Sequence, residues 1–150
     1  MIINENLLKS PQEIRAALIE LSEKINKDFN KEAIDLIAMN HAAKYLVEEL
    51  TELLEMDVRS QSFNFENYGN PVESGEVQIT KDLEFPIFDR HVILADGILI
   101  SGNTHFYVCN YLKQRLPKSL SIVSVGKKPK LLAKKIPNCY SLFNFNDEWV

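Results

Sequence analysis

The sequence has 150 residues, of which 45% are hydrophobic and 25% are charged, and its formal net charge is −4. This length and apolar content suffice for one globular domain with its own core, and no apolar run reaches the roughly 20 residues that span a bilayer. The first residues lack the basic and apolar regions of a secretory signal, and the two cysteines form no CxxC pair. We therefore expect a cytoplasmic protein without disulfides or membrane contact.

The charges divide unevenly along the chain. Residues 1–96 contain 9 Lys and Arg against 19 Asp and Glu, whereas residues 97–150 contain 8 against 2. Two explanations are open. The protein could have an acidic and a basic face, or the second part could hold an anion site where positive potential concentrates phosphate-bearing ligands. Nucleic acid is disfavoured as a partner, because the chain is acidic and its basic residues are not interleaved with aromatic ones.

The first predicted helix follows Ser10. Ser10 is a typical N-cap, Pro11 suits the first helical position, and Glu13 completes a capping box. The apolar residues that follow recur at helical spacing and predict one buried stripe. This stripe consists of Ile14, Ala17, Leu18, Leu21 and Ile25.

The next elements alternate between strands and helices. Residues 33–39 form a short apolar run that predicts a buried strand, and Asn40 is the expected cap of a helix over residues 41–56. A weakly alternating strand is expected over residues 58–65. The loop predicted over residues 66–76 is rich in Gly, Asn, Pro and Ser.

The second part of the chain continues this alternation. Strands that are apolar throughout, with helices between them, are typical of a parallel sheet covered by helices. We therefore expect an α/β fold with a mostly parallel β-sheet, in one domain over residues 1–150. Ligands of such sheets bind beyond the carboxyl ends of the strands. The remaining predicted elements are strands over residues 77–79, 91–95, 120–125 and 140–145 and a helix over residues 104–116.

A small polar loop separates the apolar strand over residues 91–95 from the helix that follows. Asp96 stands at the expected end of the strand, and the loop finishes with Ser101, Gly102, Asn103 and Thr104. Helix N-termini attract phosphate, and a glycine lets the backbone approach it closely. Simple capping is the alternative, since Ser, Asn and Thr are preferred N-caps. The nearby carboxylate favours a ribose-5-phosphate site, because it could accept hydrogen bonds from ribose hydroxyls.

These residues resemble the phosphoribosyl-pyrophosphate (PRPP) loop of type I phosphoribosyltransferases, in which an acidic strand end precedes a Thr-Gly-x-Thr turn. The flanking segments are similar, in the same order, to hypoxanthine-guanine phosphoribosyltransferases, and the likeness covers nearly the whole chain. It implies the type I phosphoribosyltransferase fold and transfer of ribose 5-phosphate from PRPP to a purine base, as in purine salvage. The similar segments are EIRAALIELSEKINKDF, YGNPVESGEVQITKDLEF, LPKSLSIVSVGKKP and YSLFNFNDEWV.

The resemblance also implies roles for particular positions. Asp96 matches the first of two adjacent acids that grip the ribose hydroxyls, and Gly97 replaces the second. Ser101, Gly102 and Thr104 match the phosphate cradle, and Asn103 replaces a commonly basic or small residue without blocking the backbone donors. The purine would be bound by Lys128, or by Lys127 if the match shifts by one residue, together with the stacking ring of Trp149 and the backbone of Val150. Tyr68 matches a tyrosine of the mobile lid.

Three departures from the family pattern affect the chemistry. Ile100 replaces an aspartate that assists at N7 of the base, and loss of such acid–base help typically costs ~10²–10⁴ in rate. The pyrophosphate loop, usually similar to Leu-Lys-Gly-Gly, is Met39-Asn40-His41-Ala42 here, without glycine or lysine. The sequence ends at Val150, before the family's Gly-Tyr-Gly-type turn and magnesium-holding acid.

We therefore expect a divergent member that binds PRPP or a purine nucleotide, with weakened or lost transferase activity. One alternative is an active purine phosphoribosyltransferase of nucleotide salvage, and another is a non-catalytic regulatory or interaction protein on the same fold. No cluster of residues has metal-ligand spacing, so Mg²⁺ would arrive bound to PRPP. The resemblance also implies a homodimer or homotetramer. His41 could contact an anion.

Overall fold

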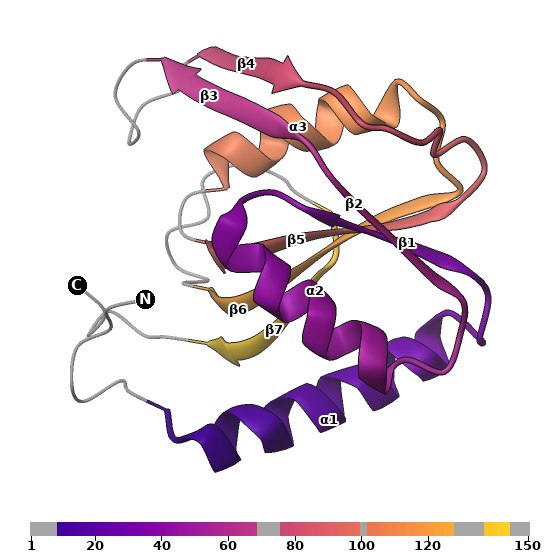
Figure 1. Cartoon of the computed structure of the whole chain (residues 1–150), viewed down its shortest axis with the longest axis vertical. Coiled ribbons are helices and arrows are strands. Elements are labelled where there is room, and N and C mark those ends of the chain that lie inside the picture. The colour runs from indigo at the N-terminus through magenta and orange to yellow at the C-terminus, as the bar shows by residue number, and fades with distance from the viewer. Residues whose placement is uncertain (1–8, 69–75, 100–101, 128–136, 145–150) are drawn as a thin grey trace.

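The structure is a computed structural model that describes residues 9–68, 76–99, 102–127 and 137–144. Helices and strands alternate in the first part of the chain, four strands then follow one another in its middle, and α3 is followed by the last two described strands (Figure 1). The helices are α1 (Pro11–Asp28), α2 (His41–Leu53) and α3 (Asn103–Lys113). The strands are β1 (Ile34–Ala38), β2 (Val58–Ser62), β3 (Asn64–Tyr68), β4 (Glu76–Lys81), β5 (His91–Leu99), β6 (Ser119–Lys127) and β7 (Cys139–Asn144).

The central sheet has five strands in the order β2-β1-β5-β6-β7, and all neighbours in it are parallel. The prediction of an α/β fold with a mostly parallel sheet is therefore confirmed. β3 and β4 form a separate antiparallel hairpin, which lies beyond α3 in Figure 1. α1 and α2 cover one face of the sheet, and α3 covers the other.

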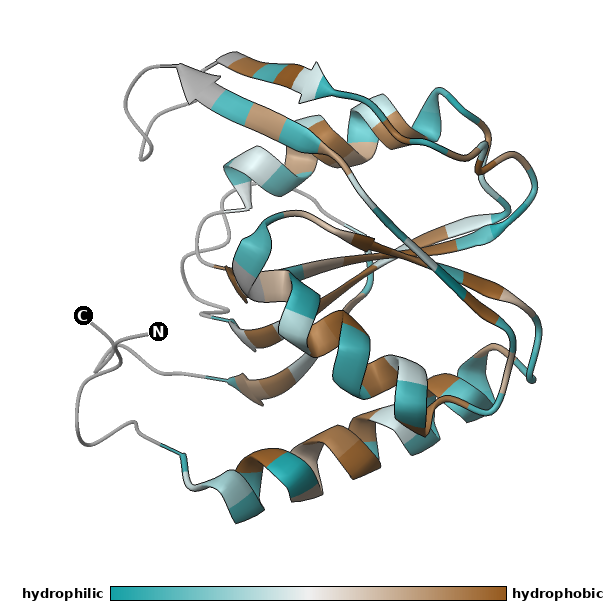
Figure 2. Cartoon of the chain, in the orientation of Figure 1, coloured by the Kyte–Doolittle hydropathy of each residue, from teal (hydrophilic) through white to brown (hydrophobic). Residues whose placement is uncertain are grey.

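The hydrophobic pattern explains this layering. Figure 2 shows mostly hydrophobic residues along the central strands, whereas α1 and α2 alternate between hydrophobic and hydrophilic residues. β1 is buried over all five of its residues, as expected of a strand with helices on both sides. Among the described residues, no helix is both long and apolar enough to cross a bilayer.

Local signals set the starts of α1 and α2 as predicted. The Ser10 hydroxyl accepts a hydrogen bond from the Glu13 N–H at 3.1 Å, and the Glu13 carboxylate accepts one from the Ser10 N–H at 3.2 Å. This is the predicted capping box. The Asn40 side chain caps α2 by accepting a hydrogen bond from the Ala43 N–H at 2.9 Å.

Several predicted boundaries are wrong. The strand expected over residues 58–65 is divided into β2 and β3, because Phe63 leaves the sheet and is buried between it and the hairpin. The predicted loop over residues 66–76 begins later, since β3 continues to Tyr68. The two later helices end at Leu53 and Lys113, three residues earlier than predicted.

β5 is also longer than predicted. It continues through Asp96 to Leu99, so Asp96 lies within the strand rather than beyond its end. An acid followed by a glycine suggests a turn. Here the Asp96 carboxylate has hydrogen-bond partners inside the protein, so it can be buried within β5 and the strand continues beyond it.

A charged cluster is buried on the α3 face of the sheet. Asp35, in β1, has no exposed surface, and two arginines bind its carboxylate. Arg59 contacts Oδ2 at 2.5 Å and Oδ1 at 3.1 Å, and Arg90 contacts Oδ1 at 2.7 Å. Arg59 also donates to the Pro86 carbonyl at 2.7 Å. The cluster thus ties β1, β2 and the segment before β5 together.

Candidate functional site

The connections of the sheet define one favourable place for a ligand. The chain leaves β1 into α2 on one face of the sheet and leaves the adjacent strand β5 into α3 on the other face. Diverging connections of this kind leave a crevice at the carboxyl ends of the two strands, where α/β proteins bind ligands. Asn40 follows β1, and Asp96 lies near the end of β5.

The Asp96 carboxylate is held by groups from three segments. Oδ1 accepts a hydrogen bond from Asn40 Nδ2 at 2.6 Å and another from the Gly97 N–H at 2.7 Å. Oδ2 lies 2.8 Å from Nε2 of His105, in the first turn of α3. Burial acts to raise the pKa of this carboxyl, but the contacts with His105, Gly97 and Asn40 outweigh it and lower the pKa below its usual value.

His105 is a site residue that the sequence did not reveal, since its role there was expected to be structural. Its side chain is 5% exposed, and its Nε2 is buried beside the carboxylate. The ring nitrogen approaches Oδ2 closely, although it is not aligned for a directed hydrogen bond. The contact is therefore mainly electrostatic. Nothing in the sequence connects a histidine in the first turn of α3 with an acid on β5.

Asn40 uses both ends of its amide inside the protein. The oxygen caps α2, and the nitrogen donates to Asp96. The preceding residue, Met39, donates its N–H to the Ala95 carbonyl at 2.9 Å, which fixes this turn against β5. The side chain at the pyrophosphate-loop position is thus committed to internal bonds, while the neighbouring His41 is exposed.

The start of α3 is suited to an anion. Its N-cap is Gly102, which has φ of 76° and has no side chain to cap the helix. An α-helix leaves its first N–H groups without acceptors within the helix and carries a positive dipole end there. The first turns of α2 and α3 contain no acidic residue, unlike that of α1, which has Glu13. The N-cap residue itself therefore supplies no side-chain cap to α3.

A polar row crosses the sheet beside Asp96. Ser124 of β6 pairs in register with Asp96, and Ser141 of β7 pairs with Ser124. The two hydroxyls are 2.8 Å apart. Ser124 has no exposed surface, and Ser141 is half-buried. The parallel register brings these residues together, and their spacing in the sequence gives no sign of it.

The described residues leave the side-chain position of Gly97, directly after Asp96, unfilled. No described atom beyond its chain neighbours lies within 4 Å of the position that a Cβ would take on this residue. A side chain could therefore be accommodated at the position of the family's second acid without displacing described parts of the protein.

The β3–β4 hairpin is anchored to α3 at its base. Asp82, directly after β4, accepts a hydrogen bond from the Tyr111 hydroxyl at 2.6 Å and is paired with Arg115. The bonds from Arg115 and Tyr111 lower the pKa of the Asp82 carboxyl to about 2. Tyr68, the expected lid residue, is the last residue of β3.

Several other predicted site residues lie outside the described part of the chain: Ile100, Ser101, Lys128, Trp149 and Val150. Lys127, the alternative to Lys128, is the last residue of β6 and pairs with Leu99 and Asn144. It lies three residues beyond Ser124, which corresponds to roughly 10 Å along a strand.

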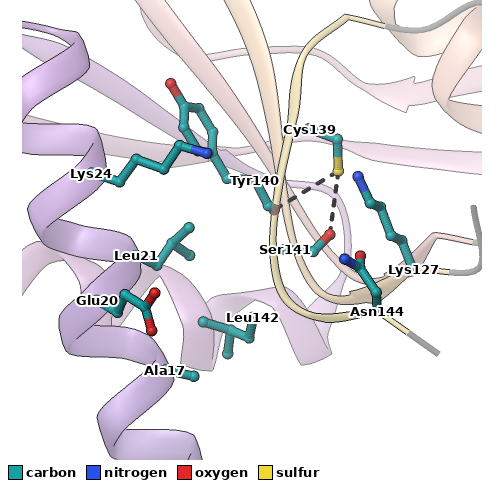
Figure 3. Close-up of a pocket in the computed structure, with 10 residues that line it drawn as sticks. All are labelled: Ala17, Glu20, Leu21, Lys24, Lys127, Cys139, Tyr140, Ser141, Leu142 and Asn144. Carbon is teal, nitrogen blue, oxygen red and sulfur yellow. Dashed lines mark hydrogen bonds between the residues drawn. The ribbon is translucent and has the colours of Figure 1, made fainter.

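Lys127 also lines a pocket of about 350 Å³ at the edge of the sheet. Figure 3 shows Lys24 and Leu21 of α1 on one side of this pocket and Lys127, Asn144 and Cys139 on the other. The pocket lies along β7, the last strand of the sheet, and its lining includes Ser141, the outer member of the polar row that starts beside Asp96.

The two cysteines are expected to differ in reactivity. Burial raises the pKa of the Cys109 thiol to about 12, while Cys139 is half-buried and lines the pocket of Figure 3. Because the thiolate is the reactive form, a disulfide reagent such as DTNB should modify one thiol in the native protein and two in guanidinium chloride. Equal reaction of both thiols in the native protein would contradict the buried position of Cys109.

Among the described residues, no group of three or more His, Cys, Asp and Glu side chains is placed to hold a metal ion. Asp96 is the acid at the crevice, and its carboxylate already has nitrogen partners. The described donor set therefore does not fit a metal site formed by the protein alone.

A parallel sheet with a helix N-terminus at its switch point is the place where α/β proteins commonly hold anionic ligands. The family model of the phosphoribosyl transferase domain matches residues 4–150, and the chain belongs to this family.

Known relatives confirm the resemblance seen in the sequence. The chain is 30% identical over 144 residues to hypoxanthine phosphoribosyltransferase of Buchnera aphidicola subsp. Schizaphis graminum, covering 94% of this chain and 81% of that protein. It is 25% identical over 153 residues to hypoxanthine-guanine phosphoribosyltransferase of Mycobacterium tuberculosis, covering 97% and 76%. A crystal structure of the Bacillus anthracis hypoxanthine-guanine phosphoribosyltransferase matches with a TM-score of 0.88 at 25% identity, covering 97% and 86%. The type I phosphoribosyltransferase fold is thereby confirmed.

Proposed function

We propose that the protein binds PRPP or a purine nucleotide at the start of α3 and transfers ribose 5-phosphate to a purine base slowly or not at all. The observation that carries this proposal is the left-handed Gly102 at the N-terminus of a helix without first-turn acids, beside a buried acid on the preceding strand. Such a terminus is a ready anion site. The 5′-phosphate would lie against residues 101–104, with the sugar toward Asp96.

The purine would lie farther along the carboxyl edge of the sheet. The resemblance places Lys128, Trp149 and Val150 around the base, and the relatives named for hypoxanthine and guanine support a purine. Lys127, roughly 10 Å beyond the Asp96–Ser124 pair, is the alternative to Lys128. We propose that residues 1–150 act together as one domain in this binding, with Tyr68 on the hairpin that would cover the ligand.

The weakened transfer follows from groups that the chain lacks. Position 100 is isoleucine, which cannot exchange a proton with the base, so the ~10²–10⁴-fold contribution of acid–base catalysis is absent. The Asn40 amide is committed to α2 and Asp96, which leaves the exposed His41 as the side chain that can approach pyrophosphate. Stabilisation of a leaving pyrophosphate is therefore poor.

Magnesium would enter with the substrate. The described residues supply no metal site of their own, so Mg²⁺ would be held by oxygens of PRPP and by water.

We further propose a cytoplasmic salvage role and assembly into a homodimer or homotetramer, as the resemblance implies. Light scattering tests the assembly directly.

Calorimetry and a coupled assay test this proposal together. Titration with GMP, IMP and PRPP should give saturable binding of at least one of them, while the assay with PRPP, Mg²⁺ and hypoxanthine or guanine should show turnover below about 1 s⁻¹, the lower end of usual enzyme rates. Absence of binding by all three ligands would refute the nucleotide site. Turnover well above that rate would show an active purine phosphoribosyltransferase instead.

A further inference from the structure

We propose that this site binds the phosphate and base of a nucleotide without reading the ribose hydroxyls, so that ribonucleotides and deoxyribonucleotides bind with similar affinity. This inference rests on the proposed function, because it concerns the sugar of the same ligand. It follows from the partners that already surround Asp96 and from the open space at Gly97.

The first step is the internal use of the carboxylate. A carboxylate has about four acceptor positions on its two oxygens. Two on Oδ1 are taken by Asn40 Nδ2 and the Gly97 N–H, at 2.6 Å and 2.7 Å. Oδ2 faces the His105 ring at 2.8 Å. A ribose hydroxyl would find both positions of Oδ1 taken and could approach only Oδ2, beside the buried His105 ring.

The second step is that these groups are fixed in place. The His105 ring is 5% exposed in the first turn of α3, and the Asp96 residue is 8% exposed. Asn40 cannot turn toward a ligand without giving up the cap of α2. Displacing Asn40 would leave its buried amide nitrogen without this hydrogen bond, which is costly inside a protein. The lowered pKa of Asp96 agrees with a carboxylate already stabilised by its surroundings.

The third step is the missing second acceptor. Gly97 follows Asp96 and offers no side chain, and the place of its Cβ has no described neighbour within 4 Å. Among the residues that the structure describes, none therefore brings a second carboxylate to the place of this Cβ. From Gly97 to Asn146 the sequence has no acidic residue, so no acid of that segment can replace it.

Selectivity for a hydroxyl requires a protein group that depends on it. A site built to hydrogen-bond a substrate hydroxyl rejects the analogue without it by roughly 10⁴–10⁵, because its own polar groups are then left unpaired. Here Asp96 Oδ1 keeps its bonds from Asn40 and Gly97 whether or not the hydroxyl is present. Removal of the hydroxyl should therefore change affinity little.

The test compares GMP, 2′-deoxy-GMP and 2′,3′-dideoxy-GMP by calorimetry on the wild-type chain. The three dissociation constants should agree within about threefold, a difference below roughly 0.7 kcal/mol. A preference of more than tenfold for GMP over either deoxy form would overturn the inference while leaving the nucleotide site intact. If none of the three binds, the proposed function itself fails, and the inference fails with it.

A gain-of-selectivity variant provides the second readout. Gly97→Asp places a carboxylate in the open space, and its preference for GMP over 2′-deoxy-GMP should rise at least tenfold above the wild-type ratio. The added charge opposes the phosphate equally in both ligands, so the ratio separates hydroxyl recognition from repulsion. Asn110→Asp, on an exposed position of α3, adds the same charge away from the crevice and should leave the ratio unchanged. An unchanged ratio in a folded Gly97→Asp protein would contradict the inference.

Discussion

Thr104→Glu is expected to abolish nucleotide binding while the protein remains folded. Thr104 is the second residue of α3, after Asn103. An acid in the first turn interacts favourably with the helix dipole, by about 0.3–1 kcal/mol, so the variant should melt at or above the wild-type temperature. The same carboxylate would occupy the region proposed for the phosphate.

Charge repulsion sets the size of this effect. Two like charges 4 Å apart near a protein surface repel by about 4 kcal/mol. A loss of at least 100-fold in GMP affinity, or about 2.7 kcal/mol, is therefore expected. Calorimetry with GMP measures the loss, and thermal denaturation monitors folding.

Gln12→Glu is the matched control for Thr104→Glu. Gln12 is exposed and is likewise the second residue of its helix, α1, which covers the face of the sheet opposite α3. The Gln12→Glu substitution adds the same charge at the same position of a helix as Thr104→Glu. Its GMP affinity should stay at the wild-type value. Retained GMP binding by a folded Thr104→Glu protein would show that the phosphate binds elsewhere.

Asp35→Ala is expected to lower the free energy of unfolding by about 3–5 kcal/mol, the usual cost of removing one partner of a buried ion pair. The carboxylate is fully buried, and Arg59 and Arg90 are each about one-third exposed and lose their shared acceptor. For a chain of this length, each kcal/mol corresponds to about 2–4 °C in Tm. A decrease of roughly 10 °C should follow.

Glu55→Ala provides the comparison for Asp35→Ala. Glu55 pairs with Lys31 at 3.4 Å, and both side chains are more than half exposed. Exposed pairs contribute about 0–1 kcal/mol, so its Tm should change little. Chemical denaturation of both variants measures the difference. Similar losses in the two variants would contradict a special role for the buried cluster.

Much of the fold could be predicted because its signals are local. The capping box at Ser10, the cap at Asn40 and the apolar strand over residues 33–39 all indicate their elements within a few residues. Boundaries failed where tertiary contacts override such signals. Phe63 breaks a strand because it is buried between the sheet and the hairpin, and Asp96 lies inside β5 because partners from two other segments bind it.

The site was predictable in part for the same reason. Residues 101–104 and the acid at Asp96 are close in sequence, so their pairing could be inferred from the chain and from the family resemblance. His105, Ser124 and Ser141 could not, because only the sheet register and the placement of α3 bring them to Asp96. The contact with His105, together with the bonds from Asn40 and Gly97, decides how the carboxylate is used.

The central claim is that a phosphate binds at the N-terminus of α3. Amide chemical-shift mapping by NMR tests it most directly, with titration of the ¹⁵N-labelled protein by GMP, guanosine and ribose 5-phosphate. The largest shifts should appear at the N–H groups of Gly102, Asn103 and Thr104 with GMP and ribose 5-phosphate, and guanosine should not produce them. If the shifts caused by GMP lie elsewhere, or if guanosine moves the same amides equally, the claim is contradicted.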